Sequence, residues 1–452
     1  MRIADAPLFS GADSAWWRME DPTNQMVVTA VLTFDGPIDA DALRATLEHK
    51  LLAYPRFRRH VAEPPAGIGR PRWAEGDDFS LDHHLRDAWL PEPADAAALH
   101  TFVSTLMSTT LDYDRPLWQF HHVRNYETGS ALVVRTHHCV ADGIALVKLL
   151  LSLGDEDALQ SGAPAIYAND RPPPTVVPWA WRMRLTGPRG VTGAVRMGGS
   201  TAAVLGRLLA MAADPDTLLR GKLTTRKRAA WSRPFVLDDV RFAARALGGT
   251  VNDLVLTLVA GALRGYLEQR RPIADGKRVR AIVPVNLRRP GDPDTLGNRF
   301  GLVFVPLPVG TADPLERFRA VKRTMDRVKR SPEALVLFGM LELFGRTTKR
   351  VEKLAVEFLA RNATLIMTNV PGPREPVHLC GRRLKTLMAW VPQSGRVGLG
   401  VSIMSYAGKA QLGVAADAQL VPEPDAVIQA FDADLACLLE RVGLLPQEVA
   451  AT

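Results

Sequence analysis

The pattern of hydrophobic and polar positions predicts strands and helices that alternate along the chain. Short apolar runs bounded by turn residues are typical of strands, whereas apolar residues that recur every three or four positions are typical of helices. This alternation indicates an α/β fold. Up to residue 153, the pattern predicts strands at 26–34, 117–123 and 131–138 and helices at 39–54, 97–111 and 144–153.

The same alternation begins again at about residue 233. The stretch before it is rich in proline and small polar residues, which is typical of a linker. We therefore expect two α/β halves, residues 1–163 and 233–452, joined by a basic, proline-rich linker at 164–232. In the second half, the pattern predicts helices at 250–269, 313–330 and 423–442, strands at 278–288, 301–309 and 363–373, and a hairpin at 398–417.

Length and composition agree with a globular protein of two parts. A chain of 452 residues is too long for one ordinary core, and its 47% hydrophobic and 23% charged residues are usual for a folded protein. Cys139, Cys380 and Cys437 have irregular spacing, so neither a disulfide framework nor a cysteine-based zinc site is expected. The chain has no uncharged apolar run of about 18 residues and no apolar core of a signal peptide. We therefore expect a cytoplasmic protein without a signal peptide or a transmembrane helix.

The positive charge of the chain is concentrated in one segment. The formal net charge is +8, and residues 171–233 carry 12 Lys and Arg but 2 Asp and Glu. Such a segment suggests an anionic partner, which could be lipid head groups, the phosphates of a ligand or nucleic acid. A solvated linker without any partner has the same composition. Nucleic acid is the least expected partner, because no recognisable binding module accompanies the charge.

The clearest candidates for chemistry are His137 and His138, in the sequence THHCVADG. They follow a predicted strand and precede a predicted helix, where α/β sheets usually carry their functional groups. A histidine in this place can accept a proton from a hydroxyl group near neutral pH. Asp142 could cap the helix or pair with a cation, and Gly143 would permit a sharp turn or a close approach of substrate.

Two further histidine pairs, at 83–84 and 121–122, lack the acid and the glycine at this spacing, so structural roles are expected for them. A metal site at HHxxxD is conceivable, but no third cluster of strong ligands is visible. No GxSxG nucleophile elbow occurs, which disfavours a Ser-His-Asp hydrolase. We therefore expect neither a metal nor a cofactor.

The stretch HHCVADG resembles the HHxxxDG signature of the CoA-dependent acyltransferase superfamily. With further stretches, the chain resembles the bacterial wax ester synthase/diacylglycerol acyltransferase family from about Trp16 to Asp417. The resemblance implies two chloramphenicol-acetyltransferase-like α/β domains with mixed sheets and an active-site tunnel at their interface. The stretches occur in the order of the family: PLW at 116–118, VNDLVL at 251–256, PVNLR at 284–288, LGN at 296–298 and TNVPGP at 368–373.

The resemblance also implies an activity, the direct transfer of a fatty acyl group from acyl-CoA to diacylglycerol, to a long-chain alcohol or to both. No acyl-enzyme is implied, and acyl-CoA is a substrate. His138 would be the general base, and His137 would support it or partly replace it. Asp142 would pair with Arg288, which follows the strand that contains PVN.

The oxyanion of the transition state needs a preorganised hydrogen-bond donor. Asn286, Thr368 and Asn369 are candidates, and the sequence does not choose among them. Asn252 and Asp253 belong to a family motif on a predicted helix, so an architectural role is expected for both.

Two other functions are compatible with the sequence. A condensation-domain-like enzyme would use a carrier-protein thioester and an amine, which PLW and TNVPGP disfavour. A catalytically silent lipid-surface-binding protein would not need the intact HHxxxDG residues. For an active enzyme, long apolar substrates and the basic, tryptophan-bearing linker favour peripheral contact with an anionic membrane or lipid-droplet surface.

Overall fold

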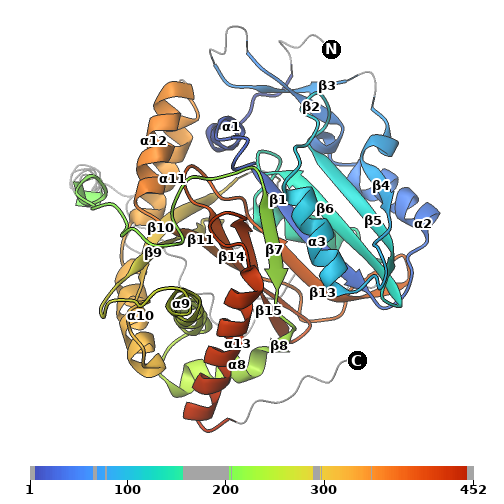
Figure 1. Cartoon of the computed structure of the whole chain (residues 1–452). Helices are drawn as coiled ribbons and strands as arrows, with labels where there is room; N and C mark the ends of the chain where they lie inside the picture. Colours follow the sequence, from blue (N-terminus) through green and yellow to red (C-terminus); the bar gives the residue numbers. More distant parts are fainter. Residues whose placement is uncertain are drawn as a thin grey trace, which may run out of the picture.

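Two mixed β-sheets form the centre of the molecule, and helices pack around them (Figure 1). The computed structural model describes residues 6–64, 69–76, 79–155, 203–204, 206–288, 296, 298–347 and 349–444. Each sheet contains both parallel and antiparallel neighbours. The expected class of two α/β units with mixed sheets is therefore confirmed.

The first sheet has the strand order β12-β13-β1-β6-β5-β4. Its strands are β1 (Val27–Phe34), β4 (Leu85–Ala88), β5 (Trp118–Tyr126), β6 (Gly129–His137), β12 (His378–Leu379) and β13 (Arg382–Trp390). The helices of this part are α1 (Gly11–Arg18), α2 (Ala40–Thr46), α3 (Ala96–Met107) and α4 (Gly143–Ser152), with short turns at Leu47–Leu51, Pro55–Phe57 and Leu81–His83. A separate pair is formed by β2 (Arg59–Ala62) and β3 (Arg72–Glu75).

The second sheet has the order β10-β9-β11-β14-β15-β7, and β8 also pairs with β15. Its strands are β7 (Lys227–Trp231), β8 (Phe235–Val236), β9 (Val279–Asn286), β10 (Phe300–Leu307), β11 (Leu365–Pro371), β14 (Leu399–Tyr406) and β15 (Lys409–Asp417). Its helices are α8 (Leu237–Ala246), α9 (Val251–Glu268), α10 (Pro314–Val328), α11 (Glu333–Phe344), α12 (Lys349–Arg361) and α13 (Pro424–Arg441).

Strand β13 belongs to the first sheet although it comes from the second half of the chain. It pairs antiparallel with β1, from Thr29 opposite Trp390 to Phe34 opposite Leu384. Because β1 is buried along nearly its whole length, an open edge there would leave backbone groups unpaired in apolar surroundings. β7 differs from expectation in a similar way, since its residues lie in the expected linker at 164–232 but pair with β15. The two halves are thus interleaved.

The elements predicted from hydrophobic periodicity are present, with shifts of a few residues at their ends. The predicted hairpin turns at Ala407 and Gly408, which both have positive φ. The pattern did not predict α1, α8, α11, α12 or β13. Most of the expected linker lies outside the described residues.

Buried histidines form part of the apolar core of the first half. The ring of His84 stacks on Trp118 at a centroid distance of 4.4 Å, and its Nδ1 lies 2.8 Å from the Trp118 carbonyl oxygen. His121 and His122 are buried on β5. These positions agree with the structural roles expected for the pairs at 83–84 and 121–122. Burial lowers the pKa of His84 and of His121 to about 4.

Among the described helices, none is by itself long and apolar enough to cross a membrane. The bent pair of α8 and α9, with an angle of 99° at the break, meets the requirement of length and composition only when the two are taken together.

We predict that His121 makes the stability of the fold depend on pH in a defined direction. Its pKa is about 4 in the folded protein and about 6.5 in an unfolded chain, so unfolding takes up a proton between these values. The stabilisation that depends on the neutral ring is complete above about pH 6.5 and decreases as the pH falls toward 4. Replacing His121 by Phe should therefore flatten the loss of stability between pH 7 and pH 5, measured by urea unfolding. The exposed His83 provides the control, because H83F should leave that slope unchanged; equal slopes for H121F and the original protein would contradict the prediction.

Candidate active site

The turn between β6 and α4 carries His138 into a large cavity. The backbone N–H of His138 donates to the carbonyl of Met26 at 2.6 Å, which holds the start of the turn beside β1. The cavity has a volume of about 1480 Å³. Residues of α1 and α4 line it from the first half of the chain, and residues of β9, β10 and β11 line it from the second. The histidine selected from the sequence therefore lies where the two halves meet.

His138 is held on two sides of its ring. Trp16 stacks on it with centroids 4.1 Å apart and an interplanar angle of 19°, and Nδ1 lies 2.8 Å from Oδ1 of Asn298. The residue is 3% exposed, and burial lowers the pKa of His138 to about 4. At neutral pH the ring is therefore uncharged, and one of its nitrogens has a lone pair that can accept a proton.

His137 does not line the cavity. Its Nδ1 accepts the backbone N–H of Cys139 at 3.1 Å, and its Nε2 lies 3.3 Å from Oε2 of Glu20. The rings of Trp17 and Tyr113 pack around it. These contacts fit a supporting role in the turn, and they leave His137 outside the group of residues that line the cavity.

Asp142 makes both of the interactions considered for it. Its Oδ1 accepts the N–H of Ala145 at 2.9 Å and so caps α4. Its Oδ2 accepts from the guanidinium group of Arg288 and from the backbone N–H of Arg299. The expected Asp142–Arg288 ion pair is therefore present, and it ties the start of α4 to the segment that follows β9.

Two roles were considered for Gly143, a sharp turn and a close approach of substrate, and the backbone does not require the first. Gly143 is absent from the glycines with positive φ, and a β carbon at this position would lie 3.7 Å from Cγ1 of Val391, an ordinary contact. The turn therefore does not require a glycine. Because Gly143 lines the cavity, the lack of a side chain leaves space beside His138 instead.

Three residues that were not predicted as site residues complete the surroundings of His138. Nδ2 of Asn298 donates to Oδ1 of Asp13 and to the carbonyl oxygen of His138, both at 2.8 Å. The other carboxylate oxygen of Asp13 accepts from Arg56 at 3.0 Å, and Arg56 also donates to the carbonyl of Val140 at 2.6 Å. Asn298 belongs to the LGN stretch, a family motif that could have marked it as a site residue. No motif marks Asp13, because its contacts are with residues distant in sequence.

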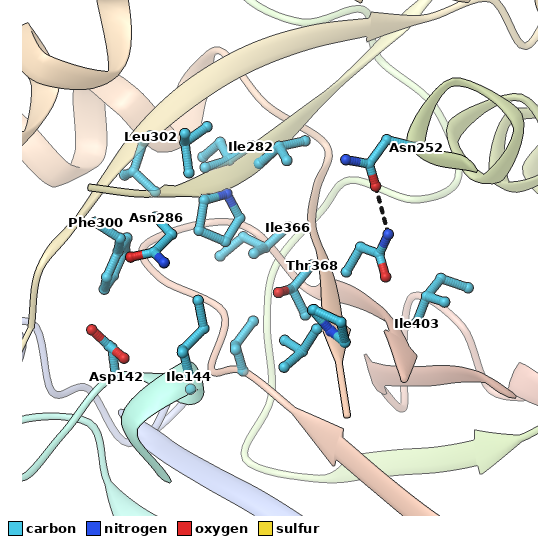
Figure 2. A pocket seen from close by; sticks show the side chains of 18 of the residues that line it. Asp142, Ile144, Asn252, Ile282, Asn286, Phe300, Leu302, Ile366, Thr368 and Ile403 are labelled. Carbon is cyan, nitrogen blue, oxygen red and sulfur yellow. Dashed lines mark hydrogen bonds between the residues drawn. The ribbon is translucent and has the colours of Figure 1, made fainter. Parts of the chain in front are cut away.

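The other predicted polar residues divide into two groups. Figure 2 shows Asn286 and Thr368 among the side chains of the cavity, on β9 and β11. Nδ2 of Asn369 donates to Oδ1 of Asn252 at 2.5 Å, and both residues line the cavity (Figure 2). The architectural role expected for Asn252 stays a prediction. Asp253 is buried outside the lining and forms the capping box of α9, which agrees with its expected architectural role.

The cavity combines apolar walls with a basic end. Its apolar lining includes Ile282, Leu302, Leu337, Met340, Phe344 and Leu359. Its cationic lining includes Lys148, Arg241, Arg245 and Arg374. The last three also line a smaller pocket that contains Asp238 and Asp239. A ligand with a long apolar part and an anionic part matches these two properties of the cavity.

The described residues contain no group of three or more His, Cys, Asp or Glu side chains arranged to hold a metal ion. The chemistry available from the chain is that of a neutral imidazole inside an apolar cavity, with hydrogen-bonding side chains nearby. Such an arrangement can remove a proton from a hydroxyl group that attacks an acyl donor.

Comparison with known proteins identifies the family. The profile of the wax ester synthase/diacylglycerol acyltransferase catalytic domain matches residues 9–255, and the profile of the WS/DGAT C-terminal domain matches residues 296–438. An acyltransferase is the class that these two matches define. The chain belongs to the wax ester synthase/diacylglycerol acyltransferase family.

Individual relatives agree with this assignment. The probable diacylglycerol O-acyltransferase tgs2 of Mycobacterium tuberculosis is 30% identical, with 96% of this chain and 98% of that protein covered. The probable diacylglycerol O-acyltransferase tgs1 of the same species is 29% identical, with 91% of each chain covered.

Solved structures share the fold. The wax ester synthase/diacylglycerol acyltransferase from Marinobacter aquaeolei VT8 has a TM-score of 0.69 at 20% identity, over 97% of this chain and 100% of that one. The first condensation domain of the calcium-dependent antibiotic synthetase has a TM-score of 0.64 at 15% identity, over 98% and 97%.

Proposed function

We propose that this acyltransferase moves a fatty acyl group from acyl-CoA to the free hydroxyl of diacylglycerol. The observation that carries the proposal is a neutral, buried His138 in a large cavity with apolar walls and a basic end. The names of the relatives support diacylglycerol as the acceptor. A long-chain alcohol offers the same hydroxyl group, so wax ester synthesis by the same site is part of the proposal.

In this reaction His138 acts as a general base. It takes the proton of the acceptor hydroxyl as the oxygen attacks the thioester carbonyl. The C–S bond then breaks, and the leaving thiolate takes up the proton from the imidazolium group, which restores neutral His138 and gives the ester and CoA. We assign Asn286 and Thr368 as the side-chain donors to the oxyanion, because both line the cavity, whereas Asn369 is exposed and one of its two N–H groups is used by Asn252.

Direct transfer is favoured over an acyl-enzyme. The nearest thiol in the chain sequence, Cys139, is buried and does not line the cavity, and burial raises the pKa of this thiol above its usual range. A thiol in that state is a poor nucleophile. Direct transfer therefore requires the acceptor hydroxyl and the thioester to reach His138 in the same cavity.

We predict that the two adjacent histidines differ sharply in their effect on turnover. Removing a general base typically costs about 10²–10⁴-fold in rate, so His138→Ala should lower kcat by this factor with palmitoyl-CoA and diolein. His137→Gln alters a ring outside the cavity lining. It should lower the melting temperature while kcat falls far less than in His138→Ala. The measurement is CoA release with diolein and, separately, with hexadecanol.

The same assay separates the alternatives. CoA release without any carrier protein argues against a condensation-type donor requirement. The proposed activity would be overturned if the folded protein released no more CoA than H138A with either acceptor. That result would favour a silent lipid binder.

The basic end of the cavity supports CoA as the donor. Arg241 and Arg374 line both the main cavity and the smaller pocket beside it, and Lys148 lies on the wall of the main cavity. Arg241 is paired with the exposed Asp238 at 2.8 Å, so it is held in place at this end. Guanidinium groups form charge-assisted hydrogen bonds with phosphates, which suits the nucleotide part of CoA.

We predict that R241A/R374A raises the KM for palmitoyl-CoA by roughly tenfold, because hydrogen bonds to charged groups contribute about 1.5–3 kcal/mol. The KM for palmitoyl-N-acetylcysteamine, a thioester without phosphates, should not change. Arg323→Ala, at an exposed arginine of α10, is the control. Equal effects on both donors would contradict a phosphate contact at this end.

The helices α11 and α12 support contact with a lipid surface. Their inner residues, including Met340, Phe344 and Leu359, line the cavity. Their outer residues include Leu343 and Leu354, which are 61% and 68% exposed. The side chains of Arg350 and Lys353 are exposed on α12, and that of Arg346 is exposed in the turn between the two helices. Figure 1 shows α12 at the outside of the molecule. Apolar side chains among cations suit an anionic lipid surface. The contact expected for the linker stays a prediction, because most of that segment lies outside the described residues.

We predict that L343D/L354D weakens flotation with phosphatidylcholine vesicles that contain phosphatidylglycerol, because two charges would then oppose insertion of the apolar side chains. Trp89→Asp, which changes a residue 62% exposed beside β4, is the matched control and should not alter flotation. Equal loss in both variants, or no loss in either, would contradict the assignment of this face.

A further inference from the structure

We infer that Asn298 and Asp13 are positioning residues that determine which ring nitrogen of His138 carries the proton. The inference rests on the proposed role of His138 as a general base and adds two residues to it. Both are buried, Asp13 at 0% and Asn298 at 7% exposure. They connect α1, the segment before β10 and the turn after β6.

The carboxylate of Asp13 determines the orientation of the Asn298 amide. Oδ1 of Asp13 receives the backbone N–H of Asn298 at 3.2 Å and its Nδ2 at 2.8 Å. A carboxylate that is paired with Arg56 can only accept hydrogen bonds. The carbonyl oxygen of His138, also 2.8 Å from Nδ2, can likewise only accept. Turning the amide over would place Oδ1 against both acceptors, so the NH₂ group must lie on this side.

The orientation of the amide in turn determines the tautomer of His138. The side of Asn298 that faces the ring is Oδ1, 2.8 Å from Nδ1. Because Oδ1 can only accept, Nδ1 must carry the hydrogen of the neutral ring, and Nε2 keeps the lone pair. A neutral imidazole without this partner would distribute its proton between the two nitrogens. The hydrogen-bond chain thus keeps Nε2 ready to accept the hydroxyl proton.

Helix α1 brings the required groups to His138. It carries both Asp13 and Trp16, which stacks on the ring. The helix lies so close to the end of α11 that a β carbon on Gly345 would be 1.8 Å from the carbonyl oxygen of Gly11. Only glycine fits such a backbone contact, and the contact fixes the place of α1. Arg56 then joins Asp13 to the carbonyl of Val140 in the turn itself.

A purely structural role for Asn298 makes a different prediction from a positioning role. A structural crosslink affects stability, whereas a residue that sets the protonation of the base also affects the pH dependence of kcat. The test compares Asn298→Leu, which removes the acceptor at similar volume, with Asn298→Asp, which places a carboxylate beside Nδ1. Activity is measured with palmitoyl-CoA and diolein over pH 4–8.

We expect N298L to lower kcat about 10- to 100-fold while the KM of each substrate changes by less than about twofold, as is typical when only a transition-state interaction is removed. N298D should move the acid limb of the kcat profile to higher pH by about one unit or more, since a nearby negative charge favours the imidazolium. The control is Asn362→Leu, at a buried asparagine that donates to Phe358 and does not line the cavity. N362L should lower the melting temperature without moving the pH profile.

The outcomes separate this inference from the proposed function. A fully active His138→Ala would remove the proposed base and the inference with it. An inactive His138→Ala together with an unshifted pH profile in folded N298D would overturn the inference alone. If N298L does not fold, the profile of N298D decides the question.

Discussion

The hydrogen bond between Nδ1 of His138 and Oδ1 of Asn298, 2.8 Å long, is the contact on which the site depends. It joins residues 160 positions apart in the chain, one after β6 and the other before β10. The Asp142–Arg288 pair makes a second connection between the same two parts. Because β13 also crosses into the first sheet, the halves are not independent units that meet by chance at a cavity. A displacement of one half relative to the other would break the contacts that orient His138.

Burial has two consequences for the chemistry. Burial is the main cause that lowers the pKa of His138 to about 4, so the ring is neutral at physiological pH. The polar groups behind the ring do not line the cavity and are paired among themselves, Asp13 with Arg56 and with Asn298. The buried charge of Asp13 is therefore compensated by Arg56 and Asn298, outside the cavity lining. Trp16 fills the remaining space against the imidazole.

The sequence was sufficient to predict local secondary structure and the site residues that belong to a motif. Hydrophobic periodicity was sufficient for β6 and α4, and their spacing placed His138 and Asp142 at the start of the helix. The Asp142–Arg288 pair followed from the family motifs. Contacts between distant residues could not be predicted: Asp13 and Asn298 are 285 positions apart. For Gly143, the backbone does not require glycine, and its position in the cavity wall leaves close approach of substrate as a prediction. α11 was missed because it is apolar on nearly all sides and has no helical stripe.

The most direct test is ¹⁵N NMR of protein that carries ¹⁵N-labelled histidine, with the His138 signals assigned by their absence from the spectrum of H138A. The account predicts that at pH 7 His138 is neutral, with its proton on Nδ1 and a bare Nε2, and that this state persists to pH 5. A proton on Nε2 at pH 7, or a positively charged ring at pH 6, would contradict the central claim that a buried, oriented, neutral imidazole is the base.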